Sequence, residues 1–340
     1  MKLKDRYIPS PYPVQQAVER LFSLTFGEGR GVGVGGEAVG GEAGSGGKAS
    51  YKTFEVGDCM YKVQFNPARI TSSAAKVDPT SIRERKCFLC PANLPPEQKG
   101  VPFKDNYMIL VNPFPIFPRH LTIPDIRHAS QRILPRIGDM LDLAEALDDL
   151  IIFYNGPKCG ASAPDHAHFQ AGNKGFLPIE EEWKYKKAGK IVDYGKAFLS
   201  FLDDAPRATL VIEAESKCDA VALFRIVYDS MELKPGDDEP MMNVLAWYEE
   251  SKWIVCIFPR ELHRPSCYRS EGDKNILISP ASVDMGGVFI TPMEKDFDKI
   301  TARDIHEILS EVCIAPEKFH GLRQQIKKQL LSAVAARSEV

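Results

Sequence analysis

The amino-acid sequence predicts an α+β fold of two similar halves, each an antiparallel sheet with packed helices, of which the second is degenerate. The first half reads strand, strand, helix, strand, strand, and its neighbouring strands lie close enough in sequence to pair as antiparallel hairpins. The second half repeats this theme weakly and lacks the pattern His166-x-His168-x-Gln170. A duplicated fold with one functional copy explains both observations.

Composition excludes several classes of protein. The chain has 340 residues, of which 44% are hydrophobic and 26% are charged, as expected of a soluble globular protein. Its formal net charge of -3 argues against a nucleic-acid partner, which requires a basic face. No run of about 18 apolar residues and no apolar leader is present, so we expect no membrane partner and a cytoplasmic location. The eight cysteines are scattered and are expected to be reduced thiols.

The N-terminal region, residues 1–50, is expected to hold a helix and a flexible glycine-rich loop. Residues 11–25 have apolar positions at helical spacing. In residues 27–47, 11 of 21 positions are glycine, and Gly31 to Gly36 satisfy the dinucleotide-binding pattern G-x-G-x-x-G. Because the residues that follow keep breaking any helix, we interpret this stretch as a flexible surface excursion rather than a phosphate-binding turn.

The functional half is expected to span residues 51–205. Its patterns predict strands at 51–54, 60–65, 107–111, 120–124, 150–154 and 166–171. A helix is expected from about 127 to 149, bent or interrupted at Pro135.

The degenerate half is expected to span residues 206–340. A hairpin is predicted from 241–248 and 252–258 around Glu250, followed by a strand at 288–291 and helices at 301–312 and 316–335. The run 253–260 echoes 107–113 in sequence, which supports the duplication.

The segment Asp165-His166-Ala167-His168-Phe169-Gln170 is the most informative in the chain. Successive side chains of an extended strand point to opposite faces, so His166, His168 and Gln170 are expected on one face. A loop rich in small residues, 156–162, precedes them and offers backbone N–H groups and the Ser162 hydroxyl to an anion. An exposed polar strand face is the bland alternative.

This pattern suits nucleophilic attack by a histidine on phosphorus. A neutral imidazole forms a covalent intermediate that a second acceptor can break, provided that the other ring nitrogen is held by a hydrogen-bond acceptor. The amide of Gln170 can donate to a phosphate oxygen without taking up a proton. Cys159 lies in the loop, but nothing near it in sequence would generate a thiolate.

The run from Asn155-Gly156-Pro157 through Gly160-Ala161-Ser162 to His166-Ala167-His168-Phe169-Gln170 resembles the active-site segment of the histidine-triad superfamily. It looks most like the transferase branch, which includes galactose-1-phosphate uridylyltransferase, diadenosine tetraphosphate phosphorylase and GDP-hexose phosphorylases. In that branch glutamine replaces the third histidine, as Gln170 does here. The resemblance implies two histidine-triad-like halves and a nucleotidyl group carried by His168. Asp165 is a departure, because these relatives usually pass straight from proline to histidine.

The resemblance also points to a substrate pocket, and it extends to the segments around Asn112 and Arg69. The expected substrate-binding residues are Arg69, Lys76, Asn112, Phe114, Asn155, Lys158, Gly160, Ala161 and Ser162. Arg119 is a further candidate cation, and Phe117 a further candidate to sandwich a base, although aromatic residues near prolines are commonly core residues. In the second half, Ser282, Asp284, Gly286 and Gly287 resemble a stretch that faces the acceptor.

Cys87 and Cys90 form a C-x-x-C motif, which by itself is ambiguous between a redox pair, half of a zinc site and chance. The prolines that follow disfavour a redox pair at the start of a helix. Zinc in a structural site takes four Cys or His ligands. The resemblance implies His128 and His166 as the other two, so structural zinc is the expected cofactor; two buried cysteines without metal remain the alternative.

The leading hypothesis is a nucleotidyltransferase or phosphorylase. Its expected partners are a nucleotide sugar or dinucleoside polyphosphate as donor, and phosphate or a hexose 1-phosphate as acceptor. A hydrolase of the same superfamily is the first alternative, which Gln170 disfavours because an imidazole protonates a leaving group more readily. The second is a zinc-stabilised nucleotide-binding protein without turnover. The sequence does not indicate the base, the sugar or the oligomeric state.

Overall fold

A computed structural model describes residues 3–8, 13–26 and 50–338 of the chain. The predicted glycine-rich stretch at 27–47 lies outside the described residues. Within them, the strands form one sheet of ten strands and one of three. No helix of the described part is both long enough and apolar enough to cross a bilayer.

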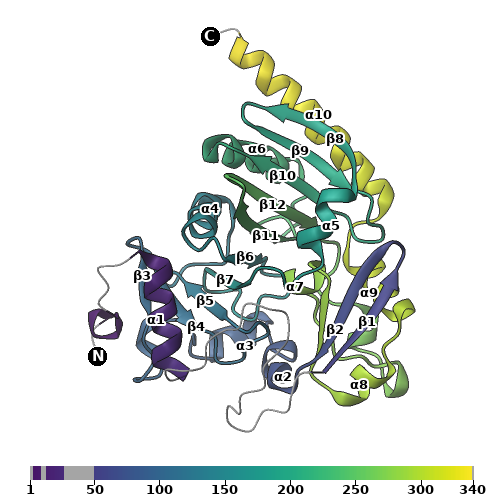
Figure 1. The fold of residues 1–340 in the computed structure, drawn as a ribbon. Coiled ribbons are helices and arrows are strands. Elements are labelled where there is room, and N and C mark those ends of the chain that lie inside the picture. Colours follow the sequence, from purple (N-terminus) through teal and green to yellow (C-terminus); the bar gives the residue numbers. More distant parts are fainter. Residues whose placement is uncertain (1–2, 9–12, 27–49, 339–340) are drawn as a thin grey trace.

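The ten-stranded sheet runs through the middle of the molecule (Figure 1) in the order β3-β4-β5-β7-β6-β11-β12-β10-β9-β8. Every neighbouring pair in it is antiparallel. The strands of its first five positions are β3 (Val101–Phe103), β4 (Tyr107–Val111), β5 (His120–Pro124), β6 (Leu150–Asn155) and β7 (His168–Asn173). Those of the other five are β8 (Lys187–Tyr194), β9 (Ala197–Leu202), β10 (Leu210–Ala214), β11 (Met242–Glu249) and β12 (Lys252–Pro259).

The order of strands repeats within this sheet. Lettered along the chain, β3 to β7 lie in the order a, b, c, e, d, and β8 to β12 do the same from the opposite edge. In each set one helix connects the third strand to the fourth: α4 (Ile137–Ala146) and α6 (Lys217–Ser230). The sets meet where β6 pairs with β11. We propose that the boundary between the halves lies before β8 rather than at residues 205 and 206.

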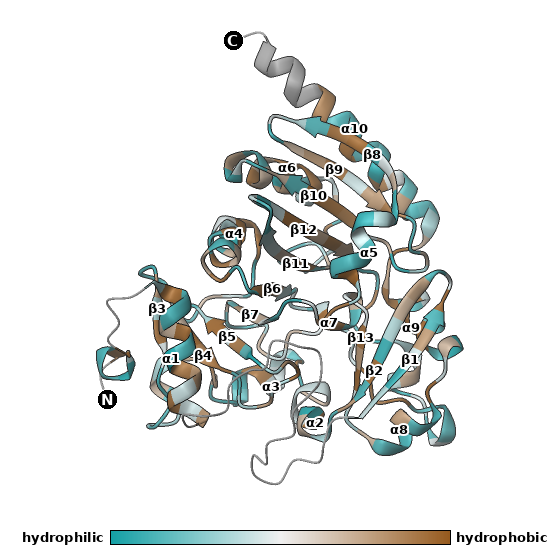
Figure 2. Cartoon of the chain, viewed as in Figure 1, coloured by the Kyte–Doolittle hydropathy of each residue, from teal (hydrophilic) through white to brown (hydrophobic). Residues whose placement is uncertain are grey.

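Two layers cover the faces of the large sheet. Alternate residues of β6 show this directly, since Ile152 and Tyr154 belong to one buried apolar cluster and Ile151 and Phe153 to the other. The first cluster lies under α1 (Val14–Phe26), α4, α6 and α10 (Pro316–Ser338). Figure 2 shows the apolar residues gathered along the strands of the sheet.

The second cluster lies under the three-stranded sheet and four further helices of the described chain. That sheet has the order β1-β2-β13, with β1 at Ser50–Val56, β2 at Cys59–Phe65 and β13 at Val288–Thr291. Its helices are α5 (Ile179–Tyr185), α7 (Ser282–Met285), α8 (Glu294–Lys299) and α9 (Ala302–Val312). Two short helices, α2 (Ile70–Ser73) and α3 (Pro79–Glu84), follow β2 and border the site described below.

The predicted α+β class with a large antiparallel sheet is confirmed, whereas in the small sheet β13 pairs parallel to β2. The predicted helices at 301–312 and 316–335 and the hairpin of β11 and β12 are confirmed, and so is the helix at 11–25 over its described residues. The helix expected from about 127 to 149 is wrong at its start. The structure has a loop up to Ile133, a short 3-10 turn at Leu134–Arg136, and α4 from Ile137 onward. The segment before Pro135 instead makes contacts at the ends of β5 and β7, which require irregular backbone.

The echo of 107–113 in 253–260 is also misplaced in space. By strand order β12 corresponds to β7 and not to β4. β4 and β12 are both interior strands of the sheet and are buried on both faces, so both require continuous apolar runs. The similarity that the sequence showed is therefore that of two buried strands.

Candidate functional site

His168 begins β7, where it pairs with Pro124 of β5. A turn ends just before it, closed by the hydrogen bond from the amide of His166 to the carbonyl of Ala163. The fully buried side chain of Gln131 forms hydrogen bonds with both the amide and the carbonyl of His168. Gln131 Oε1 accepts from the amide of His168 at 2.8 Å, and its Nε2 donates to the carbonyl of His168 at 3.1 Å. The backbone of His168 is therefore held from both sides.

The ring of His168 is fixed in one tautomer. Its Nδ1 lies 2.8 Å from the carbonyl oxygen of His166, which can only accept, so Nδ1 carries the proton and Nε2 carries a lone pair. The residue is 5% exposed and lines a cavity. Burial lowers the pKa of His168 to about 4, although the bond to His166 acts in the opposite direction. The ring is neutral at pH 7, as a nucleophile requires.

Gln170, two residues along the same strand, is oriented by His120 of β5. The amide of Ile116 donates to His120 Nδ1 at 3.0 Å, so the proton of the His120 ring is on Nε2. That Nε2 lies 3.0 Å from Gln170 Oε1 and donates to it. Burial, with the charge of Arg69, lowers the pKa of His120 to about 3, so this ring is neutral too. With its oxygen occupied, Gln170 has its NH₂ group left to donate into the cavity.

The cavity has a volume of about 880 Å³ and includes most of the residues predicted to bind substrate. Its lining includes Arg69, Lys76, Asn112, Phe114, Asn155, Gly160, Ser162, His168 and Gln170. This volume falls within the range of small-molecule sites.

Four residues of the first half that were predicted or considered for the substrate pocket do not line this cavity. Lys158 forms an ion pair with Asp237 on the surface, and Arg119 forms one with Asp149. Ala161 is buried behind the lining. Phe117 is a core residue 2% exposed, whose ring packs 5.6 Å from that of Phe153.

The two predicted asparagines line the cavity but are engaged in holding its walls. Asn112 donates to Thr122 and accepts from the amide of Phe114, which shapes the turn that carries the exposed Phe114 ring. Asn155 Oδ1 accepts from the amide and hydroxyl of Ser282 and from Asn243 at 2.9 Å. Asn155 therefore connects the loop after β6 to the second half.

The loop 156–162 approaches the second half closely at Gly160. This residue has φ +90°, and a Cβ atom there would lie 2.6 Å from Ala281 Cβ and 3.0 Å from the carbonyl oxygen of Pro280. Cys159 beside it is fully buried, and burial raises the pKa of its thiol to about 12. The thiol is therefore protonated, in agreement with the sequence analysis.

The second half contributes part of the cavity wall. Ser279, Ala281, Val283, Asp284 and Ile290 line it from the α7 region and β13. Burial raises the pKa of Asp284 to about 6, although hydrogen bonds from backbone amides lower it. Ser282 binds Asn155 instead, and Gly286 and Gly287 are absent from the lining.

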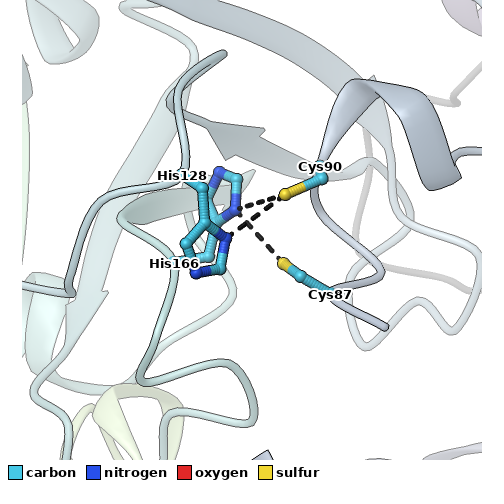
Figure 3. Close-up of side chains that lie close together, drawn as sticks. All are labelled: Cys87, Cys90, His128 and His166. Carbon is cyan, nitrogen blue, oxygen red and sulfur yellow. Dashed lines mark hydrogen bonds between the residues drawn. The ribbon is translucent and has the colours of Figure 1, made fainter. Parts of the chain in front are cut away.

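The four predicted metal ligands lie together (Figure 3). One ligand atom from each of Cys87, Cys90, His128 and His166 lies within 4.8 Å of the other three. Nδ1 of His166 is 3.2 Å from Cys87 Sγ, and Nδ1 of His128 is 3.2 Å from Cys90 Sγ. Each Nε2 faces an oxygen: His166 Nε2 donates to the carbonyl of Asp125 at 2.7 Å, and His128 Nε2 is 3.8 Å from Asp165. The cluster has the ligand set of a metal site with its outer partners in place.

The expectation that His166 shares a face with His168 and Gln170 is wrong. β7 starts only at His168, and His166 lies in the preceding turn with its ring in the cysteine cluster. Strand alternation does not apply outside the strand. The carbonyl of His166, rather than its ring, acts on His168.

Three residues of the site were not predicted from the sequence. His120 was placed only as a strand residue and Gln131 as part of a helix, and both act through contacts between segments far apart in sequence. Arg85 lines the cavity as well. No local pattern distinguishes any of them from ordinary polar residues.

The fold is similar to that of a phosphorylase of known structure. The crystal structure of yeast Ap4A phosphorylase Apa2 matches with a TM-score of 0.54 and 17% identity, covering 79% of this chain and 90% of that one. The same enzyme in complex with Ap4A matches with a TM-score of 0.49 and 18% identity over 79% and 90%. The ADP-glucose phosphorylase from Arabidopsis thaliana with bound ADP-glucose matches with 0.37 and 16% identity over 73% and 95%.

Two family models each match one part of the sequence. Residues 190–333 match the GDPGP1-like, C-terminal domain, and residues 46–173 match a domain of unknown function, DUF4922. No curated protein matches the chain in sequence.

The close contact at Gly160 can be separated from the cost of its backbone conformation. We expect Gly160→Ala to lower the free energy of unfolding by about 2–4 kcal/mol, because alanine is strained at positive φ and its Cβ meets Ala281. Gly236→Ala is the matched control, since Gly236 has φ +81° with no atom within 4 Å, and about 1 kcal/mol is expected there. Urea unfolding measures both. Equal losses would show that the contact with Ala281 is of no consequence.

Proposed function

We propose that this protein is a nucleotidyltransferase of the phosphorylase type, which forms a covalent nucleotidyl intermediate on His168. One observation carries the proposal: His168 has its proton held on Nδ1 by the His166 carbonyl, and it lines the cavity together with an oriented Gln170 amide. An imidazole with an unprotonated Nε2, beside a preorganised hydrogen-bond donor, is the arrangement needed for attack on phosphorus.

In the first step, Nε2 of His168 attacks the α-phosphorus of the donor, and the bond from phosphorus to the bridging oxygen breaks. The electron pair leaves with that oxygen, as a phosphate or nucleotide product. The ring becomes cationic, and Nδ1–H remains bonded to the His166 carbonyl, which stabilises that charge. The Gln170 NH₂ group donates to a non-bridging oxygen whose charge increases in the transition state.

In the second step, an oxygen of the acceptor attacks the same phosphorus and the bond to Nε2 breaks, which returns the neutral ring. Phosphate as acceptor yields a nucleoside diphosphate, and a hexose 1-phosphate yields a nucleotide sugar. Gln170 has no proton to transfer, so a leaving group that is already an anion suits the site better than one that must be protonated. This disfavours the hydrolase alternative.

The lining of the cavity supports a donor that carries phosphate groups and a base. Arg69 and Lys76 are cations, while Gly160 and Ser162 lie at the end of the small-residue loop, so these four are proposed to bind phosphate groups. Phe114 is 41% exposed and offers a ring to a base. The yeast phosphorylase with this fold acts on Ap4A, a dinucleoside polyphosphate. A dinucleoside polyphosphate or a nucleotide sugar is therefore the proposed donor.

Zinc is the proposed occupant of the cysteine and histidine cluster. Thiolate and imidazole ligands at about 2.3 and 2.0 Å from one tetrahedral zinc lie roughly 3.5 Å apart, close to the 3.2–3.6 Å found between these atoms. The ion would have a structural role. It would hold His166, whose carbonyl orients His168.

The covalent intermediate is the first prediction of this proposal. Incubated with Ap4A, ADP-glucose or a GDP-hexose and no acceptor, the protein should gain one nucleoside monophosphate by mass spectrometry, because the second step is blocked. The adduct should be labile to acid and stable to base, as a phosphoramidate is. His168→Ala should form none, while His306→Ala, on the exposed face of α9, should behave as the wild type. An adduct on the His168→Ala variant would refute the assignment, and folded wild-type protein that binds nucleotide without an adduct would favour the silent binding protein.

The role of His120 in orienting Gln170 is a second prediction. His120→Leu should slow adduct formation by about 10- to 100-fold, because the Gln170 amide is then free to turn its oxygen toward the phosphate. Gln170→Ala should cost a similar factor. The double variant should be little slower than either single one, since both changes remove the same donor. Stopped-time mass spectrometry gives the rates, and losses that multiply would show that the two residues act separately.

Metal content is a third prediction. We expect about one zinc per chain in the purified protein by mass-spectrometric elemental analysis. Cys90→Ser and His128→Ala should lower that content and the unfolding temperature, because each removes a ligand. Cys218→Ser, an exposed thiol on α6, is the control and should change neither. Wild-type protein without metal, purified from zinc-supplemented cells, would contradict the proposal.

A further inference from the structure

Arg85 stands where the segment after α3 reaches the cavity, two residues before Cys87. Its side chain is 22% exposed, and its guanidinium carbon lies 5.1 Å from the centre of the Phe88 ring. Nη2 donates to Asp165 Oδ1 at 2.5 Å. The planar group is therefore held both by an ion pair and by an aromatic face.

Asp165 is the residue that departs from the pattern of the histidine-triad transferases. Both of its oxygens are engaged: Oδ1 with Arg85, and Oδ2 at 3.8 Å from Nε2 of His128. Its side chain is only 17% exposed. Asp165 thus lies between His128 of the cysteine cluster and Arg85. Its ion pair restricts the orientation of the Arg85 guanidinium.

Arg85 has more donors than partners. A guanidinium carries five N–H groups, and among the described residues Asp165 is the hydrogen-bond partner that the structure provides. Nη1 is buried without any partner. An unsatisfied buried donor is costly, and more so on a charged group. An acceptor with several oxygens beside Arg85 would remove that cost.

The charge of the cavity favours an anion as this acceptor. Its charged lining residues are three cations, Arg69, Lys76 and Arg85, and one carboxyl group, that of Asp284. Lys76, Ser81 and Arg85 come from a single segment of the chain, whereas His168 and Gln170 come from the sheet. One cavity thus combines a wall with a nucleophile and a wall with two cations.

We propose that Arg85 forms a second phosphoryl subsite of this cavity, with Asp165 as the residue that positions it. The subsite rests on the proposed function: it binds the phosphate group that leaves the α-phosphorus when His168 attacks in the first step, and the phosphate that attacks in the second. A guanidinium offers two parallel donors to a phosphoryl group, which a lysine does not. The ligand class is an inorganic phosphate or the distal phosphoryl group of a polyphosphate.

Binding of inorganic tripolyphosphate to the zinc-containing protein, measured by isothermal titration calorimetry, tests the subsite without any turnover. Arg85→Gln should raise the dissociation constant about tenfold or more, the effect of losing charge-assisted hydrogen bonds. Arg83→Gln is the matched control: it removes the same charge from an exposed side chain of α3 that donates a hydrogen bond to Thr80, and it should change binding less than about twofold. Equal effects of the two variants would overturn the proposal.

Two further variants keep the test decisive. Arg85→Lys retains the charge and should still weaken binding about threefold, so an affinity equal to that of the wild type would overturn the forked contact. Asp165→Asn retains Arg85 and adds net positive charge, yet it should weaken binding if Asp165 positions the guanidinium; tighter or unchanged binding would overturn that role. His168→Ala should bind tripolyphosphate like the wild type. Failure of the covalent intermediate and failure of this subsite are thus recorded by separate measurements.

Discussion

The hydrogen bond from Nδ1 of His168 to the carbonyl of His166 is the constraint on which the site depends. It decides the tautomer of the ring and leaves Nε2 free. The bond requires the backbone to turn just before β7, and three independent contacts enforce that turn. Gln131 binds the backbone of His168, the amide of His166 bonds to Ala163, and the ring of His166 is held in the cysteine cluster. The proposed zinc site would therefore act on the proposed nucleophile through one carbonyl group rather than through chemistry of its own.

The repeated strand order explains why a site exists on one half only. Both sets of five strands present the same face to the layer that contains β1, β2 and β13. In the second set this face carries Ile254, Cys256 and Phe258 of β12, and the small sheet and helices cover it as core. In the first set the corresponding strand, β7, carries His168 and Gln170, and the face remains open as the cavity. The second half thus has core where the first half has the cavity. It also supplies part of the cavity wall, and the hydrogen bond from Ser282 to Asn155 attaches that wall to the first half.

What the sequence could predict was what local patterns encode. The strands, the placement of His168 and Gln170 along the lining, and the four ligand residues followed from alternation, spacing and resemblance. The turn at His166 did not, because alternation says nothing about where a strand begins. The loop at 127–133 was predicted to be helical because its residues are compatible with a helix. The hydrogen bond from the backbone of His168 in β7 to the Gln131 side chain overrides that propensity. Strands β8 to β10 and helix α6 were not predicted, since their arrangement becomes evident only from the repeated strand order of the structure.

The insertion of Asp165 is best understood through the same constraint. An added residue in the turn before β7 would be expected to disturb the orientation of His168, yet the hydrogen bond to the His166 carbonyl is present. The added carboxylate is accommodated because it lies beside two groups that can donate to it, the guanidinium of Arg85 and Nε2 of His128. Its cost in desolvation is offset on both sides. The turn therefore gains a contact with the cavity wall while it keeps the geometry of His168, so that one short segment supports the cysteine and histidine cluster, His168 and Arg85 together.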